Sequence, residues 1–212
     1  MMNRWLRSCV LAFLALAPHT ISLLHAQSAV APSHAFTLSI PDTVVLDQDN
    51  RKLHFYSDLI KGKTVAINFI FTTCTTICPP LTANFAKLQR IMSERGENDF
   101  QLISVSVDPE TDTPEKLKCY AEKFGAKAGW SFVTGTRAEL EPIWRAFKVY
   151  TSNKLDHTAM VVIGNDTQDR WIYASGLSSA KELGGAIDSV LSPKQPVHAS
   201  AAGYKEGHRN SQ

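Results

Sequence analysis

The chain has few cysteines, four in 212 residues, and no excess of charge of either sign. So few thiols exclude a small domain built on a disulfide framework, because such scaffolds are dense in cysteine. Arg4 and Arg7 are the charged residues among the first 26, so the rest of the chain carries 20 basic and 20 acidic residues. This balance argues against a nucleic acid or an anionic lipid surface recruited by bulk charge. The sequence also contains no internal repeats.

An uninterrupted apolar run long enough for a membrane span is missing as well. Residues 9–24 are mostly apolar but are interrupted by Pro18 and His19, and a span requires about 20 apolar residues. Basic residues before this run and the small residue Ala26 after it predict a secretory signal peptide over residues 1–26. An uncleaved N-terminal anchor is the alternative, because the residues before Ala26 form an imperfect cleavage motif. We therefore expect an exported protein, either periplasmic or on the periplasmic face of the inner membrane.

Composition divides the remaining chain into three parts. Residues 27–35 are small and polar and are predicted to form a linker. Residues 36–192 are long enough for one domain with a well-buried core. Residues 193–212 lack hydrophobic periodicity and have little to bury, so we expect a disordered tail.

The domain alternates between strand and helix patterns, which predicts an α/β fold. Nearly continuous apolar runs are typical of central strands that are covered on both faces. Strands are expected at 36–40, within 44–55, at 62–71, 100–109 and 130–135, and in a hairpin at 159–175; helices are expected at 81–92, 113–124, 140–147 and 183–190. A central strand that runs into a cysteine pair and then a helix indicates a thioredoxin-like (peroxiredoxin-type) fold. Its mixed sheet would carry an N-terminal β-hairpin.

The cysteine pair lies in the stretch FTTCTTICPP, where three residues separate Cys74 from Cys78. A proline disfavours the helical conformation in the residue before it, so Pro79 and Pro80 predict a helix that begins at about Pro80. Both cysteines would then lie on a loop at a helix N-terminus. That position favours the thiolate, which attacks disulfides and binds metals.

Three kinds of chemistry remain open for this pair. A structural disulfide would close a very short loop and add little stability. A redox site of the thioredoxin type would have two intervening residues, whereas here there are three. Two thiolates can chelate a soft ion such as Cu(I) but require a further ligand. Structural zinc sites normally require four ligands.

His157 is the candidate for a third ligand among the five histidines that follow residue 26. It lies just before a predicted strand, and in a thioredoxin-like topology that loop approaches the cysteine loop. A histidine at such a position is more often structural, and the neighbouring thiolates are what favour a ligand role. Asp156 could orient the imidazole, although a solvated carboxylate is the simpler interpretation.

Three other residues near these segments receive simpler interpretations. Asp108 and Asp112, in the stretch DPETDTP, are predicted to be turn and helix-cap residues. Cys119 lies in a predicted helix and is expected to be a small apolar residue, buried or half-buried.

Four segments carry a resemblance to a known family: FIFTTCTTICPP, SVDPETDTPEKLKCYAEKFGA, WSFVTGTRAELEPIWRAFKVY and DHTAMVVIG. Together, over residues 60–190, they resemble the copper-binding Sco/SenC proteins that help assemble cytochrome c oxidase. The resemblance implies a thioredoxin fold on which Cys74, Cys78 and His157 bind one copper ion per chain, as Cu(I) or Cu(II). Many members have a transmembrane anchor, whereas the N-terminus here has the pattern of a cleavable leader.

The resemblance implies a copper metallochaperone. Such a protein would receive copper from an upstream donor and deliver it to the CuA centre of cytochrome c oxidase subunit II. The alternative is a thiol–disulfide oxidoreductase that reduces the metal-site cysteines of the oxidase. His157 discriminates between the two, because a reductase does not need it. A peroxidase is disfavoured, because Phe71 occupies the position before the Thr75-x-x-Cys78 pattern where a proline is expected.

Overall fold

Residues 38–96, 99–156 and 158–192 are described by a computed structural model of the chain. The expected leader (1–26), linker (27–35) and tail (193–212) lie outside these residues, and so does His157. Within the described part, no helix has both the length and the apolar character needed to cross a membrane.

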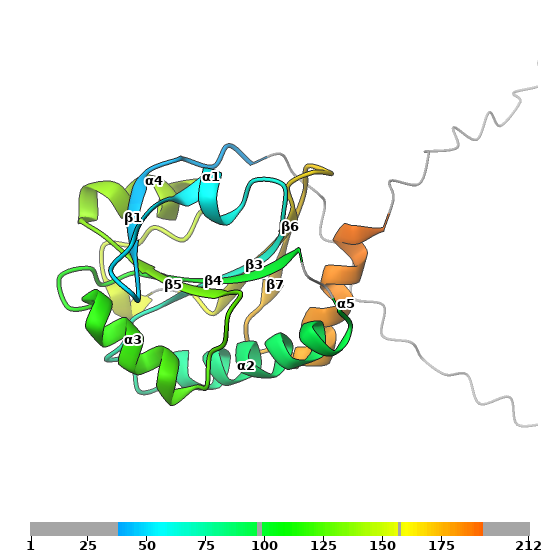
Figure 1. Cartoon of the computed structure of the whole chain (residues 1–212). Helices are drawn as coiled ribbons and strands as arrows, with labels where there is room; N and C mark the ends of the chain where they lie inside the picture. Colours follow the sequence, from blue (N-terminus) through cyan, green and yellow to red (C-terminus); the bar gives the residue numbers. More distant parts are fainter. Residues whose placement is uncertain (1–37, 97–98, 157, 193–212) are drawn as a thin grey trace, which may run out of the picture. The chain divides into compact units, whose positions relative to one another are not determined.

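A seven-stranded mixed sheet forms the centre of the domain, with the order β2-β1-β5-β4-β3-β6-β7 (Figure 1). Its strands are β1 Val44–Asp47, β2 Lys52–His54, β3 Thr64–Ile70, β4 Phe100–Ser106, β5 Trp130–Thr134, β6 Met160–Asn165 and β7 Arg170–Ser175. Strand β4 lies parallel to both β3 and β5, whereas the other pairings are antiparallel. The predicted α/β class and the thioredoxin-like arrangement are therefore confirmed.

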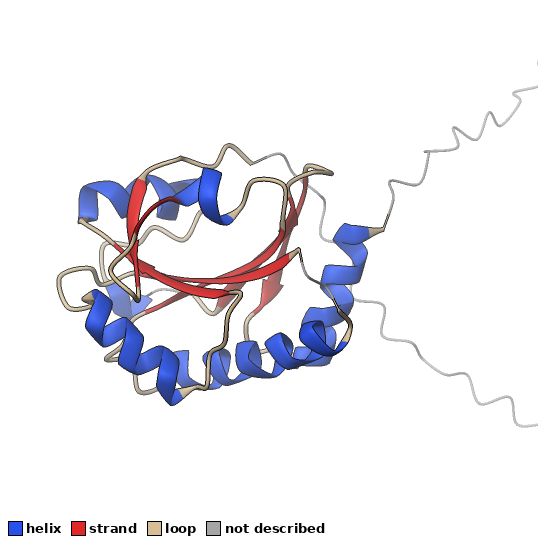
Figure 2. Cartoon of the chain, in the orientation of Figure 1, coloured by secondary structure: helices blue, strands red, loops and turns tan. Residues whose placement is uncertain are grey.

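Helices cover both faces of this sheet (Figure 2). They are α1 Phe55–Leu59, α2 Cys78–Glu94, α3 Pro114–Lys123, α4 Arg137–Ala146 and α5 Ala180–Leu191. On one face Phe69 of β3 packs against Phe147, which directly follows α4. On the other face Phe85 of α2 packs against Trp130 of β5. Each face of the sheet thus has an aromatic core of its own.

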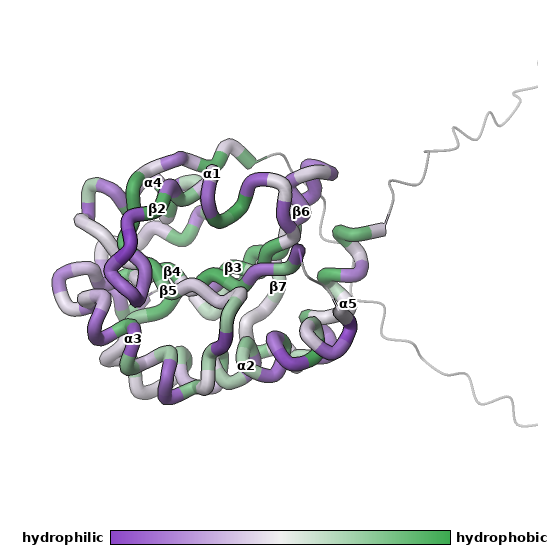
Figure 3. Tube along the Cα trace, in the orientation of Figure 1, coloured by the Kyte–Doolittle hydropathy of each residue, from purple (hydrophilic) through white to green (hydrophobic). Residues whose placement is uncertain are grey.

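Strand β3 is buried at each of its seven positions, as its continuous apolar run predicts. It pairs with β4 on one side and β6 on the other, and Figure 3 shows hydrophobic colour along β3 and β4. The strand that ends at the cysteine loop is therefore held from both sides. This rigid support fixes where the loop leaves the sheet.

The N-terminal part of the domain differs from the prediction in two places. The β1–β2 hairpin is confirmed, but residues 38–40 of the expected strand 36–40 are not in a strand. Strand β1 is already paired with β2 and β5, so it offers no open edge to this segment. A short helix, α1, follows β2 because the carboxylate of Asp42 accepts the backbone N–H groups of Tyr56 and Ser57.

Candidate metal centre

The two cysteines of the predicted site lie together where β3 leads into α2. Cys74 is 8% exposed, Cys78 is fully buried, and no disulfide joins them. The backbone N–H of Cys78 donates to the Sγ of Cys74 over 3.4 Å. Two reduced sulfur atoms are therefore held side by side at a helix N-terminus.

Helix α2 begins at Cys78, two residues earlier than predicted. The prediction that Cys78 lies outside the helix was wrong. Pro79 and Pro80 fall in the first turn, where the N–H groups have no partner within the helix, so the missing donors cost little. A residue before proline tends to avoid the helical conformation, yet Cys78 is helical here. Cys74 lies on the loop and Cys78 on the helix, so the two thiols have different surroundings.

Those surroundings move the two thiol pKa values in opposite directions. For Cys78, burial first and a hydrogen bond with Cys74 second raise the pKa to about 12. For Cys74, burial again favours the protonated thiol, but hydrogen bonds from Cys78 and Thr76 outweigh it and lower the pKa to about 7. Near neutral pH Cys74 is therefore partly ionised, whereas the Cys78 thiol beside it stays protonated.

A buried carboxylate fixes the start of the cysteine loop. Asp112 accepts both the backbone N–H and the hydroxyl of Thr72, at 3.1 and 2.5 Å, and the hydroxyl of Ser106 at 2.6 Å. Asp112 is fully buried, and burial raises its pKa. It does not cap α3, because Thr113 is the N-cap of that helix. Nothing in the DPETDTP pattern distinguishes this buried acceptor from a solvated turn residue.

The segment that leads to His157 is bound to the same edge of the sheet. Lys154 belongs to a short 3-10 helix, Lys154–Asp156, and forms an ion pair of 2.5 Å with Asp108. Its ammonium also lies 5.5 Å from the ring centre of Phe71, three residues before Cys74. Asp108 therefore has an ion-pairing role besides the turn that its carbonyl forms with Thr111 and Asp112.

The predicted third ligand is not among the residues that the structure places. His157 lies outside them, and its expected partner Asp156 is exposed. Over 38–96, 99–156 and 158–192, no three His, Cys, Asp or Glu side chains form a cluster that could hold a metal ion. Cys74 and Cys78 are brought together as predicted, and the histidine ligand stays a prediction.

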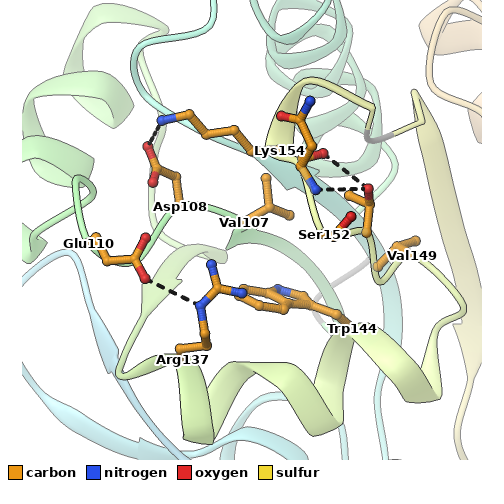
Figure 4. Close-up of a pocket in the computed structure, with 10 residues that line it drawn as sticks. Val107, Asp108, Glu110, Arg137, Trp144, Val149, Ser152 and Lys154 are labelled. Carbon is orange, nitrogen blue, oxygen red and sulfur yellow. Dashed lines mark hydrogen bonds and ion pairs between the residues drawn. The ribbon is translucent and has the colours of Figure 1, made fainter.

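A pocket of about 330 Å³ lies beside this edge, between the loop after β4, helix α4 and the segment before the 3-10 helix. Figure 4 shows that two ion pairs border it, Lys154–Asp108 and Arg137–Glu110. The guanidinium of Arg137 lies 5.8 Å from the ring centre of Trp144. Neither cysteine lines this pocket. Its charged groups are paired with one another, and they hold the loop after β4 in place from two sides.

Cys119 is exposed, so its prediction as a buried or half-buried residue was wrong. The inner face of α3 consists of Leu117, Tyr120 and Ala121. Cys119 falls between these positions and points away from the sheet.

The SCO1/SenC family model matches residues 45–191. The chain belongs to this family. A SCO1 protein homolog of Bacillus subtilis is 41% identical over 98 residues, which are 45% of this chain and 49% of that protein. A Stutzerimonas stutzeri protein named for copper binding is 29% identical over 108 residues, 51% of each chain. The matches thus span about half the length of these relatives.

A solved structure shares the fold over nearly its whole length. BsSco is described as a member of the Sco family of cytochrome c oxidase assembly proteins that has a disulfide switch. It is 27% identical, with a TM-score of 0.63 over 74% of this chain and 96% of that one. The likeness supports the thioredoxin-like arrangement derived from the strand order.

Proposed function

We propose that this protein binds one copper ion through Cys74, Cys78 and His157 and delivers it during the assembly of cytochrome c oxidase. Copper is the cargo of this reaction rather than a resident cofactor. The family to which the chain belongs supports the proposal, as do the copper-binding name of one relative and the oxidase-assembly description of BsSco.

The observation that carries the proposal is the pair of reduced thiols at the start of α2. A thiolate at Cys74 and a second sulfur beside it are soft donors suited to Cu(I). Binding would displace the proton of Cys78, because thiols coordinate as thiolates. Lys154 holds the segment leading to His157 against the same edge, which supports a third ligand from that loop.

Delivery would follow from an incomplete ligand set. Three ligands leave an open side from which an acceptor's thiols or imidazoles could take the ion by ligand exchange. The acceptor in this proposal is the CuA centre of cytochrome c oxidase subunit II, and an upstream donor supplies the copper. The leader pattern of residues 1–26 supports export to the periplasm, with or without retention at the inner membrane.

A thiol–disulfide oxidoreductase is the second candidate, and the unequal thiols favour it. A thiol that is 8% exposed and has a pKa of about 7 is suited to attack a disulfide near neutral pH. A buried neighbour with a raised pKa could then resolve the mixed disulfide. The substrate would be the oxidised metal-site cysteines of the oxidase.

Titration of the reduced protein with Cu(I) in competition with a chromophoric chelator tests the first proposal. We expect one ion per chain for the wild type and a large loss of affinity for Cys74→Ser, Cys78→Ser and His157→Ala. Transfer to a CuA domain that lacks metal would then be followed by the absorption of the acceptor. Wild-type copper affinity in His157→Ala would contradict the three-ligand site.

The same variants separate the two candidates. His157→Ala should retain the ability to reduce an oxidised CuA domain, because disulfide exchange requires only the two thiols. If oxidase assembly in cells survives His157→Ala but not Cys74→Ser, the reductase is the main role and the chaperone proposal fails.

A further inference from the structure

The first residue of α2 is tied to α3 by two hydroxyl groups. The hydroxyl of Thr82 donates to the carbonyl of Cys78 over 2.8 Å. The hydroxyl of Tyr120 lies 2.9 Å from the same Thr82 oxygen. Thr82 has a single hydroxyl proton and gives it to Cys78, so Tyr120 must be the donor in the second contact. The hydroxyl of Tyr120 therefore donates to Thr82, and the hydroxyl of Thr82 donates to the carbonyl of Cys78.

These contacts lie in the protein interior. Thr82 is fully buried and Tyr120 is 7% exposed. The Tyr120 ring packs against Phe124 and Phe132, with ring centres 4.9 and 6.3 Å away. A buried hydroxyl is costly without a hydrogen bond, and phenylalanine would fill the same apolar space. The contacts with Phe124 and Phe132 explain why an aromatic ring lies at position 120. The hydrogen bond to Thr82 explains why that ring carries a hydroxyl.

No side chain caps the start of α2, although the backbone of Phe71 is hydrogen-bonded to the Cys78 thiol. Pro79 and Pro80 have no N–H, and the Cys78 N–H is given to the sulfur of Cys74 rather than to a capping side chain. The side chain of the N-cap residue Ile77 makes no cap hydrogen bond. The hydroxyl chain from Tyr120 therefore supplies an anchor to Cys78 that side-chain capping does not.

We propose that Tyr120, acting through Thr82, is a positioning residue that holds Cys78 in place and favours the reduced dithiol over the Cys74–Cys78 disulfide. A disulfide requires an S–S distance of about 2.05 Å and Cβ atoms about 3.5–4.5 Å apart. The sulfur atoms are unbonded in the geometry that the two hydroxyls support. Oxidation brings the two sulfur atoms together, and in this proposal the accompanying shift of Cys78 weakens the bond between its carbonyl and Thr82.

The redox consequence of this proposal is independent of copper. When glutathione disulfide oxidises the pair, one protein disulfide forms and two molecules of glutathione are released. Removal of the Tyr120 hydroxyl takes away an interaction of the reduced form, so this equilibrium should move toward the protein disulfide. The expected rise in its constant is roughly threefold to tenfold, where tenfold corresponds to about 30 mV.

The test is the equilibrium of the metal-free protein in glutathione buffers, read by alkylation and mass spectrometry in a Cys119→Ser background. Tyr120→Phe and Thr82→Val should each raise the equilibrium constant for formation of the protein disulfide. Thr82→Ser, which keeps the hydroxyl, should have the wild-type value. In the Thr82→Val background, Tyr120→Phe should add no further shift. If Tyr120→Phe has the same equilibrium constant for disulfide formation as the wild type, the proposal is overturned.

Tyr56→Phe is the matched control. Its hydroxyl donates to Asp166 over 3.1 Å, at the edge of the sheet opposite the cysteines, so the variant loses a tyrosine hydrogen bond without touching α2. It should lower thermal stability slightly and leave the constant unchanged. An equal shift in Tyr56→Phe would show a general effect of stability and would also overturn the proposal.

Discussion

The ammonium of Lys154 lies 2.5 Å from the Oδ2 of Asp108, and this pair joins loops that are 46 residues apart in the sequence. The same ammonium lies over the ring of Phe71, at the end of the strand that leads to Cys74. Asp108 is 4% exposed, so little water is available to replace the lysine. One side chain therefore connects the loop after β4 and the segment before residue 157 to the end of the strand that leads to Cys74.

Replacement of Lys154 by methionine should destabilise the fold by about 1–3 kcal/mol, because a nearly buried carboxylate loses its charged partner. Chemical denaturation at neutral pH measures the change. Lys118→Met is the matched control: its pair with Asp49 is exposed on both sides, so removal should cost less than about 1 kcal/mol. Equal losses in the two variants would contradict a special role for Lys154.

The rate of Cys74 alkylation by iodoacetamide should rise with pH around a midpoint near 7, because the thiolate is the reactive form. The experiment uses Cys119→Ser, which removes the exposed third thiol. In Cys78→Ala the midpoint should move upward, since Cys74 loses the hydrogen bond from the Cys78 thiol. A midpoint that stays near 7 in Cys78→Ala would contradict this account of the lowered pKa.

Cys78 should make the reduced protein less stable at alkaline pH. Its pKa is raised to about 12 by burial and by Cys74, whereas a thiol in the unfolded chain titrates near about 8.5. The folded protein thus holds this proton more tightly, so the stabilisation is complete below about pH 8.5 and declines as the pH rises toward 12. Urea unfolding should show that the free energy of unfolding falls less between pH 8 and pH 10 for Cys78→Ala than for wild type. Cys119→Ser is the control.

Asp112→Ala should destabilise the protein by about 2–4 kcal/mol, because the substitution leaves the buried hydroxyl of Ser106 and two half-buried donors of Thr72 without their acceptor. Thermal and chemical denaturation measure the loss. Asp156→Ala removes an exposed carboxylate and should change the free energy of unfolding by less than about 0.5 kcal/mol. A loss below about 1 kcal/mol in Asp112→Ala would show that water replaces the carboxylate.

Gly176→Ala should destabilise the fold by about 1–3 kcal/mol through overpacking at the first turn of α2. A Cβ at Gly176 would lie 2.5 Å from the Cδ1 of Leu81, which follows the cysteine–proline segment. Gly185→Ala is the control, since nothing lies within 4 Å of its Cβ and alanine favours the helix. It should stabilise the protein by about 0.5–1 kcal/mol, and a loss in both variants would contradict the steric explanation.

Much of the fold was predictable from local patterns along the chain. The continuous apolar run at 62–71 predicts a strand buried on both faces, and β3 is that strand. Thr113 before Pro114 predicts the start of α3, where the Thr113 side chain accepts the N–H of Lys116. These elements follow from residues that are close together in the sequence, so no tertiary information was needed.

The errors arose where contacts between distant segments competed with a local preference. The steric effect of two prolines predicted a later start for α2, but the helix begins at Cys78, whose carbonyl is bound by Thr82 and, through it, by Tyr120. The apolar periodicity of α3 could not decide whether Cys119 faces inward, because Cys119 directly precedes Tyr120 on the inner face. Asp112 in its turn-like setting gave no sign of burial, which only the packing of Thr72 and Ser106 against it creates.

By itself the sequence determined the strand and helix order from β3 onward, the position of the two thiols after the central strand, and the Sco/SenC resemblance. Spacing, apolar periodicity and capping residues are local, and they specify elements without reference to the rest of the molecule. The tertiary structure alone decided that the thiols have unequal pKa values and which side chains hold them. Burial and hydrogen bonding across loops set both properties, through residues as far apart as Thr82 and Tyr120 or Asp108 and Lys154.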